Sequence, residues 1–297
     1  MSTLKGKVAI VTGAGSGLGR AHALALAKHG ALVVVNDLGG DRPGSGAETV
    51  ANEIREAGGR ALINGADVTD HGQVTMMVEQ AIAEWGHVDI LVNNAGILRD
   101  KSFAKMTIED FRLVVEVHLM GSVNCTKAVW DHMRSQNYGR IVMTTSSAGL
   151  YGNFGQANYA ASKMALVGLM QTLSIEGAKN NVKVNCLAPT AATAMTAQMW
   201  PPAALARLSP ESVSPGLVAL VCEDAPTRTI LLAGAGSFEC AHITMTHGVH
   251  IGEQDSAAVA VLARLDEIKD RSAEVVPANA LEQSHLEMSK AGLLASL

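Results

Sequence analysis

The sequence predicts an α/β protein, in which a doubly wound, mostly parallel sheet carries helices on both faces. Three observations predict this fold. Short apolar strand patterns alternate with helix patterns, the connections between them are short, and 297 residues suffice for one large domain. Because parallel strands need crossover connections, this alternation favours a parallel sheet covered on both faces.

The composition excludes several classes of protein. Hydrophobic residues make up 48% and charged residues 17% of the chain, which excludes intrinsic disorder. The net charge of −5, with no basic surplus, makes nucleic acid an unexpected partner. The apolar runs are too short to span a bilayer and no signal-peptide pattern is present, so we expect a cytoplasmic protein without a membrane partner. Four widely spaced cysteines without a C-x-x-C pair favour free thiols over a zinc or redox motif.

The first half of the chain alternates strands and helices. Val8 to Val11 is continuously apolar, as in a strand buried on both faces, and a glycine-rich turn follows it. The next expected elements are a helix over Arg20 to His29, a strand over Leu32 to Asn36, a helix over Glu48 to Ala57, a strand over Arg60 to Ala66, a helix over Gly72 to Trp85 and a strand over Ile90 to Asn93.

The second half continues the alternation. It is expected to contain a helix over Phe111 to Met133, a strand over Arg140 to Thr145, a helix over Tyr159 to Asn180, a strand over Val182 to Leu187, a helix over Leu217 to Glu223 and a final strand over Thr229 to Leu232. The proline-rich segment 191–216 is a candidate mobile lid, with an irregular surface loop as the alternative.

The chain is expected to divide into a catalytic domain over residues 1–250 and a helical extension over residues 251–297. The extension is less hydrophobic and contains two helix patterns, Ser256 to Asp270 and Asn279 to Gly292, separated by Pro277. We expect this extension to pack on the domain or on a neighbouring subunit.

A glycine-rich loop lies between the first strand and the first helix. It reads Thr12-Gly13-Ala14-Gly15-Ser16-Gly17-Leu18-Gly19, a T-G-x-x-x-G-x-G spacing. Glycines let a phosphate approach the backbone, and the helix N-terminus offers free N–H groups. The strand–turn–helix context favours dinucleotide binding in a Rossmann-type domain over a structural turn. The expected cofactor contacts are Gly13, Ser16, Gly17, Leu18 and Gly19.

Asp37 ends the second strand, where an acid can hydrogen-bond both ribose hydroxyls and repel a 2′-phosphate. This position favours NAD over NADP, although a turn-forming role remains an alternative and Arg42 could neutralise a phosphate. Further expected cofactor contacts follow the third and fourth strands, at Asp67, Val68, Asn93, Ala95 and Gly96.

Tyr159 and Lys163 lie four residues apart and therefore share one helix face. A nearby ammonium stabilises a phenolate, which lowers the pKa of the phenol and makes it a usable acid or base. Ser146 lies just past a strand, where its hydroxyl could hold a substrate oxygen, and Ser147 is its rival. An ordinary helix face is the alternative for the Tyr–Lys pair alone.

Taken together, these motifs resemble the short-chain dehydrogenase/reductase family over residues 5 to about 240. Three stretches give a closer match, to the (3R)-hydroxyacyl-CoA dehydrogenase module of peroxisomal multifunctional enzyme type 2 and its stand-alone bacterial relatives. These stretches are Val33 to Asp41, Asn94 to Asp100 and Tyr151 to Tyr159.

The resemblance implies NAD-linked oxidation of a secondary alcohol, of 3-hydroxyacyl-CoA or hydroxysteroid type. Tyr159 would be the general acid/base, Lys163 would lower its pKa and bind the nicotinamide ribose, and Ser146 would orient the substrate. The resemblance also implies a homo-oligomer, a dimer or a tetramer, formed through the helices over 111–133 and 159–180. A carbonyl reductase of another small ketone and a catalytically silent nucleotide-binding protein are the alternatives.

The sequence departs from the family pattern at two places. His118 stands where many members carry an Asn that supports a proton-relay water, and it is either part of the relay or a structural histidine. The usual Pro-Gly after the sixth strand is Pro189-Thr190, so the nicotinamide contacts are expected from Pro189, Thr190, Thr193 or Thr196.

Three histidines, His242, His247 and His250, follow the last expected strand. Three histidines can bind zinc, but no carboxylate or cysteine lies at regular ligand spacing and the expected chemistry needs no metal. We therefore interpret them as part of a surface loop and expect no metal.

Overall fold

The computed structural model describes residues 4–40, 42–193, 205 and 207–293. These residues form two compact units, 1–240 and 241–297. The first unit contains every candidate site residue. The functional division after residue 250 that the sequence predicts stays a prediction.

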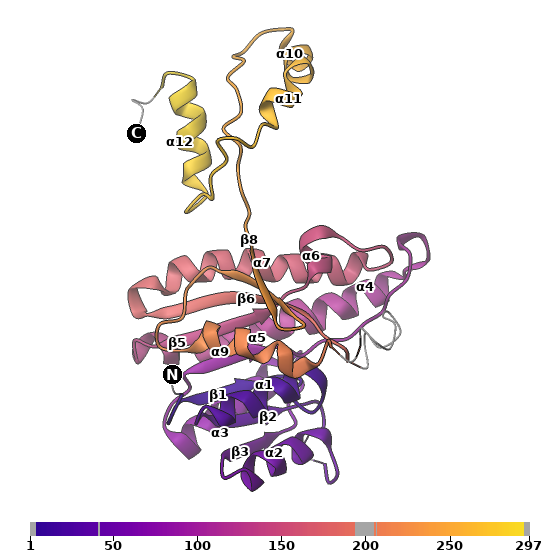
Figure 1. Ribbon diagram of the computed structural model, residues 1–297, viewed down its shortest axis with the longest axis vertical. Coiled ribbons are helices and arrows are strands. Elements are labelled where there is room, and N and C mark those ends of the chain that lie inside the picture. The colour runs from indigo at the N-terminus through magenta and orange to yellow at the C-terminus, as the bar shows by residue number, and fades with distance from the viewer. Residues whose placement is uncertain (1–3, 41, 194–204, 206, 294–297) are drawn as a thin grey trace. The chain divides into compact units, whose positions relative to one another are not determined.

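The first unit is built on an eight-stranded sheet, shown in Figure 1, with the order β3-β2-β1-β4-β5-β6-β7-β8. Every pairing from β3 across to β7 is parallel. This order reverses between β1 and β4, which places a ligand crevice at their carboxyl ends. The predicted fold class is confirmed. The strands are β1 Val8–Val11, β2 Leu32–Asn36, β3 Arg60–Asn64, β4 Ile90–Asn93, β5 Gly139–Thr144, β6 Val182–Thr190, β7 Ile230–Gly234 and β8 Ser237–Ala241.

Helices cover both faces of the sheet. Helices α7 and α9 both contact β5 and β6, so they lie on opposite faces. Helices α1 and α2 pack together on the face of α9, whereas α3, α4 and α5 lie with α7. Among the described residues, the helices of this unit are α1 Gly17–Lys28, α2 Gly46–Glu56, α3 His71–Trp85, η1 Phe103–Lys105, α4 Ile108–Val115, η2 Glu116–Met120, α5 Gly121–Ser135, α6 Ser147–Tyr151, α7 Ala157–Gly177, η3 Ala178–Asn180, η4 Pro210–Ser212 and α9 Ser214–Val221.

Two elements differ from the sequence prediction in ways that matter for the site. The helix expected over Phe111 to Met133 begins earlier, at Ile108, because Thr107 caps it by accepting the N–H of Asp110. It is also interrupted by η2, a π-helical turn that contains His118. Helix α1 begins at Gly17, inside the glycine loop.

The strand expected to be last is followed by another strand. Residues 235 and 236 form a two-residue turn with φ of +50° at Ala235 and +78° at Gly236. Positive φ at both central residues is typical of a type I′ hairpin, which joins antiparallel strands. The turn therefore adds β8 to the edge of the sheet. Alanine is an unusual residue at the first of these two positions, which explains why no hairpin is predicted from the residues here.

The candidate lid over residues 191–216 falls largely outside the described residues, which omit 194–204 and 206. Where it is described, Ala192 donates its N–H to the carbonyl of Leu208 at 2.6 Å. The segment ends in η4 and the first turn of α9. Its role as a lid stays a prediction.

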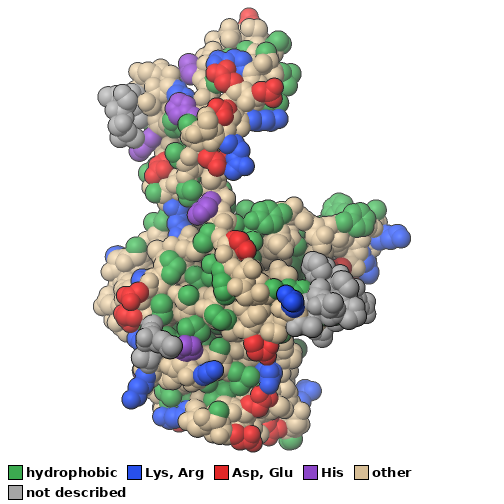
Figure 2. Space-filling model, in the orientation of Figure 1, with side chains coloured by type: hydrophobic (Ala, Val, Ile, Leu, Met, Phe, Trp, Pro, Cys, Tyr) green, Lys and Arg blue, Asp and Glu red, His purple; other side chains and the backbone are tan. Residues whose placement is uncertain are grey.

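Residues 241–293, the described part of the second unit, contain three helices, α10 Ala257–Ala263, α11 Leu265–Ile268 and α12 Leu281–Lys290. The first two replace the single helix expected over Ser256 to Asp270. None of its described residues is fully buried. Figure 2 shows its histidine side chains at separate places on the surface. Across the described ranges of the whole chain, no helix is long and apolar enough to cross a membrane.

Candidate active site

The glycine loop is locked to the loop that follows β4. The hydroxyl oxygen of Thr12 accepts the backbone N–H groups of Asn94 and Ala95, both at 3.0 Å. In return, the side-chain amide of Asn94 donates to the carbonyls of Thr12 at 2.9 Å and Gly13 at 3.2 Å. These bonds join the two strands at which the strand order reverses. Sequence reasoning chose Asn93 in this motif and missed the structural part that Asn94 plays.

The glycines of this loop are required by close backbone contacts. Gly13 has φ +62°, and a Cβ at this residue would lie 2.8 Å from Cα of Ala95. A Cβ at Gly19 would lie 2.1 Å from the carbonyl oxygen of Gly13. Both distances are shorter than van der Waals contact, so neither position accepts a larger residue without rearrangement.

The first turn of α1 has no side-chain cap. Its N-cap residue, Ser16, makes no side-chain capping bond, and no acidic residue stands in the first turn. Uncapped N–H groups and the positive end of the helix dipole favour an anion. The cradle therefore fits a phosphate group.

Asp37 lies over the glycine loop. Its Oδ2 accepts the N–H of Gly15 at 2.7 Å, and a Cβ at Gly15 would lie 2.2 Å from the same oxygen. The carboxylate is partly exposed at the end of β2. Arg42 is exposed, beside Gly39, where a Cβ would lie 3.4 Å from its Nε. Asp37 therefore contacts the glycine loop, whereas Arg42 lies beside Gly39.

The loop after β3 is held in place by α5. Asn124 donates its side-chain amide to the carbonyls of Val68 at 3.0 Å and Thr69 at 3.1 Å. The carboxylate of Asp67 accepts the N–H and hydroxyl of Thr69 at 2.9 and 2.8 Å. Two of the expected cofactor contacts, Asp67 and Val68, therefore lie in a fixed turn at the carboxyl edge of the sheet.

The other expected cofactor contacts differ in what they face. The side chain of Asn93 is buried and donates to Thr126 at 3.0 Å. Thr193 lies against the glycine loop, since a Cβ at Gly17 would meet its methyl group at 3.4 Å. Thr190 is exposed at the end of β6, next to the half-buried Pro189, and Thr196 lies outside the described residues.

The predicted catalytic residues come together at the end of β5. Ser146 lies close enough to Tyr159 to lower the pKa of its phenol as a hydrogen-bonding group. The Nζ of Lys163 lies 5.6 Å from the centroid of the Tyr159 ring and donates to the carbonyl of Thr144 at 2.5 Å. The ring of His118 meets that of Tyr159 edge-on, with centroids 5.2 Å apart. Ser147, the rival of Ser146, is exposed instead.

The predicted lowering of the Tyr159 pKa is wrong for the protein chain on its own. Burial raises the pKa of Tyr159, and the charge of Asp100 adds to this, while the hydrogen bond from Ser146 opposes it. Burial also lowers the pKa of Lys163 to about 7. Desolvation outweighs the attraction that the Tyr–Lys spacing suggests, because Lys163 is directed to the carbonyl of Thr144.

His118 is buried in the cleft as a neutral group. Burial, with the charge of Lys163 as a smaller cause, lowers its pKa to about 3. Its Nε2 lies 2.7 Å from the carbonyl oxygen and 3.0 Å from the nitrogen of Ile97. Its Nδ1 is buried without a hydrogen-bond partner among the described residues. A neutral imidazole can pass a proton along hydrogen bonds but cannot act as a cationic acid near neutral pH.

Within the described ranges, no three His, Cys, Asp or Glu side chains lie close enough to hold a metal ion. The absence of a metal requirement stays a prediction.

The sequence model of the short chain dehydrogenase family matches residues 7–203. The chain belongs to this family. It is therefore an oxidoreductase of the short-chain dehydrogenase type. A putative short-chain type dehydrogenase/reductase of Mycobacterium tuberculosis is 45% identical over 279 residues, which cover 92% of this chain and 97% of that protein.

Larger peroxisomal proteins are also similar to this chain. Peroxisomal multifunctional enzyme type 2 of Mus musculus is 51% identical over 224 residues, or 74% of this chain and 30% of that protein. This short-chain dehydrogenase spans 27% to 37% of the length of three such peroxisomal relatives. The predicted resemblance to multifunctional enzyme type 2 is confirmed, whereas the expected cytoplasmic location stays a prediction.

Two solved structures support the same assignment. Full-length peroxisomal multifunctional enzyme type 2 from Drosophila melanogaster superposes with a TM-score of 0.81 and 37% identity, covering 98% of this chain and 51% of that chain. A 7 alpha-hydroxysteroid dehydrogenase superposes with a TM-score of 0.72 and 31% identity, covering 79% of this chain and 95% of that chain. The latter was solved with NADH and 7-oxo glycochenodeoxycholic acid, which supports a nicotinamide dinucleotide as the cofactor of this family member.

Proposed function

We propose that this protein is an NAD-linked dehydrogenase that interconverts a secondary alcohol and a ketone. The observation that carries the proposal is the meeting of Ser146, Tyr159 and Lys163 at the carboxyl end of β5. The three groups can hold and protonate one substrate oxygen. A catalytically silent nucleotide-binding protein would have no physical need for this arrangement, which includes a lysine buried at energetic cost.

The residues of the crevice fit a dinucleotide. The backbone of Gly13, Ser16, Gly17, Leu18 and Gly19 would hold the phosphates at the uncapped start of α1. Asp37 would accept the adenosine ribose hydroxyls and repel a 2′-phosphate, which favours NAD over NADP. Lys163 would donate to the nicotinamide ribose. The remaining proposed contacts are Asp67, Val68, Asn93, Ala95, Gly96, Tyr159, Pro189, Thr190 and Thr193.

In the proposed reaction, the bound cofactor supplies hydride chemistry at its nicotinamide. Ser146 donates a hydrogen bond to the substrate oxygen, and Tyr159 takes the alcohol proton in oxidation or returns it in reduction. The charge of Lys163, when protonated, favours the phenolate that oxidation needs. His118 is proposed as a neutral member of the hydrogen-bonded route by which the proton leaves.

One observation favours the reverse direction as a second candidate, a carbonyl reductase. Because the pKa of Tyr159 is raised, its phenol is protonated at neutral pH, which is the form that a general acid needs for reduction. We therefore expect reduction to persist at neutral pH and oxidation to rise as the pH increases.

The substrate proposal is a 3-hydroxyacyl-CoA or hydroxysteroid-type alcohol, supported by the names of the relatives and by the bound 7-oxo steroid of one structural neighbour. The test is to follow nicotinamide absorbance with a panel of secondary alcohols and their ketones, covering acyl-CoA thioesters, steroids and simple alcohols. The pure protein should reduce NAD with at least one thioester or steroid alcohol. Turnover with simple alcohols alone would overturn the substrate proposal, and no turnover with any alcohol or ketone would overturn the enzyme proposal.

We also propose a homo-oligomer, a dimer or tetramer, formed through α4, α5 and α7. Exposed apolar side chains on these helices support it, namely Leu113 (43% exposed) on α4, and Met164 (39%) and Ile175 (52%) on α7. Light scattering at micromolar concentration should give a dimer or tetramer mass. Replacing Met164 and Ile175 by Gln together should lower that mass, and a monomeric unmodified protein would contradict the proposal.

A further inference from the structure

Three hydrogen bonds, which lie outside the catalytic cluster, tie the loop after β4 to the start of α7. They run from Gln156 Nε2 to Asp100 Oδ2 (2.7 Å), from Asn158 Nδ2 to Arg99 O (3.2 Å) and from Lys101 N to Gly155 O (2.9 Å). A fourth hydrogen bond, within the segment before α7, runs from Asn153 Nδ2 to Gln156 Oε1 (2.8 Å). Gln156 is 7% exposed. Both ends of its buried amide are thus engaged.

These bonds determine where α7 begins. Gln156 is the N-cap residue of the helix, and its carbonyl accepts the N–H of Ala160 at 2.7 Å. The buried Asn158 accepts the N–H of Tyr159 at 2.8 Å with the same side chain that donates to the β4 loop. The backbone of Tyr159 is therefore positioned by residues on another strand connection.

Asp100 also acts on Tyr159 through its charge. The phenol is approached by Ser146 after β5, the neutral His118 of η2 and Lys163 of α7 itself, and the charge of Asp100 also acts on it. Asp100 carries the negative charge of this set, and it disfavours ionisation of the phenol.

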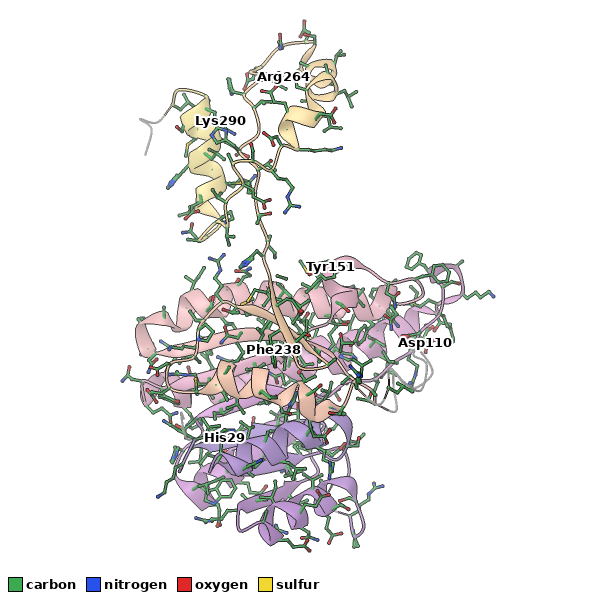
Figure 3. All side chains as sticks on the ribbon, viewed as in Figure 1. His29, Asp110, Tyr151, Phe238, Arg264 and Lys290 are labelled. Atoms are coloured by element: carbon green, nitrogen blue, oxygen red, sulfur yellow. The ribbon has the colours of Figure 1, made fainter. Side chains whose placement is uncertain are left out.

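Neither neighbouring cation forms an ion pair with Asp100 among the described residues, and Arg99 donates from Nη1 to the carbonyl of Leu98 at 2.7 Å. The Nζ of Lys101 forms its ion pair with Asp110 of α4, at 2.9 Å, on the segment labelled in Figure 3. The Asp100 carboxylate is instead engaged by the uncharged amide of Gln156. An uncharged partner holds the carboxylate in place without neutralising it.

We propose that Asp100 and Gln156 are positioning residues for the reaction at Tyr159, in which Gln156 holds the negatively charged Asp100 carboxylate at the start of α7, beside the turn that contains Tyr159. The proposal deepens the proposed function and rests on the role of Tyr159 in it. A purely structural tie would require the hydrogen bonds alone, whereas this proposal also requires the charge.

Asp100→Asn distinguishes a purely structural tie from a role of the charge, because it keeps an oxygen that can accept from Gln156 and removes the charge. Loss of a like charge stabilises the phenolate, so the ascending limb of the pH profile for oxidation should move to lower pH by roughly half a unit. The rate on that limb should rise about threefold, since one unit corresponds to tenfold. Asp110→Asn is the matched control. It removes the nearby carboxylate that pairs with Lys101, and the ascending limb of the pH profile should stay at the same pH.

A spectroscopic titration tests the proposal without turnover. The chain has three tyrosines, and subtracting the near-ultraviolet titration of Tyr159→Phe isolates the phenolate signal of Tyr159. Asp100→Asn should lower its midpoint by the same roughly half unit. Gln156→Ala, a second variant, should shift the midpoint in the same direction, because the carboxylate is no longer held at the start of α7.

The two proposals fail in different ways. Unmoved midpoints in both Asp100→Asn and Gln156→Ala would overturn the positioning role, whatever the activity. Near-normal turnover by Tyr159→Phe would overturn the proposed function, while the spectroscopic midpoint would still report on Asp100.

Discussion

The two halves of the crevice are built by different means. The half beside β1 and β2 presents backbone, and the glycines at 13 and 19 exist there because a Cβ would meet backbone atoms within 3 Å. The half beside β5 and α7 presents buried side chains whose proton affinities depart from their ordinary values, with Lys163 and His118 at pKa values of about 7 and about 3.

This difference separates the tasks of the two halves. Backbone N–H groups do not titrate, so the glycine loop can hold an anion with equal strength over a wide pH range. Buried side chains respond to pH and to each other's charge, so the other half can move a proton. Mutations in the first half should therefore change binding, and mutations in the second half should change turnover and its pH dependence.

The largest effect on activity is expected at Tyr159, and it tests whether turnover can be lost without loss of cofactor binding. Tyr159→Phe removes the proposed acid/base and should lower kcat by about 10²–10⁴-fold while leaving the Kd for NAD within about twofold. Steady-state rates and fluorescence titration of NAD measure the two quantities. A variant that loses NAD binding along with turnover would show that the two halves are not separable.

Lys163→Ala should give the next largest effect. It should change both cofactor binding and turnover, because one ammonium is proposed to serve both the cofactor ribose and the phenol. We expect a loss of about 10²-fold in kcat, weaker NAD binding, and an ascending pH limb at higher pH, since the charge that favours the phenolate is gone. Lys163→Arg keeps the charge and should move the limb less. If the ascending limb of the pH profile lies at the same pH in Lys163→Ala and in the unmodified protein, Lys163 does not favour the phenolate.

Asp37→Ala should change binding alone. Loss of a charged hydrogen-bond acceptor costs about 1.5–3 kcal/mol, so NAD affinity should fall by roughly tenfold or more. NADP should bind better to this variant than to the unmodified protein because the repulsion of the 2′-phosphate is removed. The preference for NAD over NADP should therefore be smaller. Separate titrations with the two cofactors measure it. Tighter binding of NADP than of NAD by the unmodified protein would show that Asp37 does not set the preference.

The last prediction concerns packing in the half of the crevice beside β1 and β2. Gly19→Ala places a methyl group against the carbonyl of Gly13 and should destabilise the fold by about 1–3 kcal/mol. The matched control is Gly168→Ala in α7, where a Cβ would meet nothing within 4 Å, and where alanine should stabilise the helix by roughly 0.5–1 kcal/mol. Urea unfolding of both variants gives the comparison, and equal midpoints would contradict the steric argument.

The sequence predicted the fold well because local patterns determine it. Continuous apolar runs such as Val8 to Val11 are found only where both sheet faces are covered, and the order of elements then leaves few topologies. The candidate site was predicted in outline for the same reason. The glycine loop and the Tyr–Lys spacing are local patterns that place groups at one edge of the sheet.

The parts that were missed depend on contacts between distant segments. Asn94 and Gln156 each bridge two loops, and nothing in their own neighbourhood shows which carbonyl or carboxylate they will meet. The pKa of Tyr159 was mispredicted because spacing shows a nearby ammonium but not the degree of burial that opposes it.

The π-helical turn that contains His118 has a consequence for how such a site could arise. A π turn accommodates one residue more than a regular helical turn, so the helix running from Ile108 to Ser135 behaves as a regular helix with a single insertion. Deleting one residue between 116 and 120 would restore regular geometry, and each residue in an α-helix turns about 100°. Such a deletion would change which side chain of this turn meets Tyr159, while the flanking helix faces kept their packing. One codon thus separates a regular helix that only covers the sheet from one that presents His118 beside Tyr159.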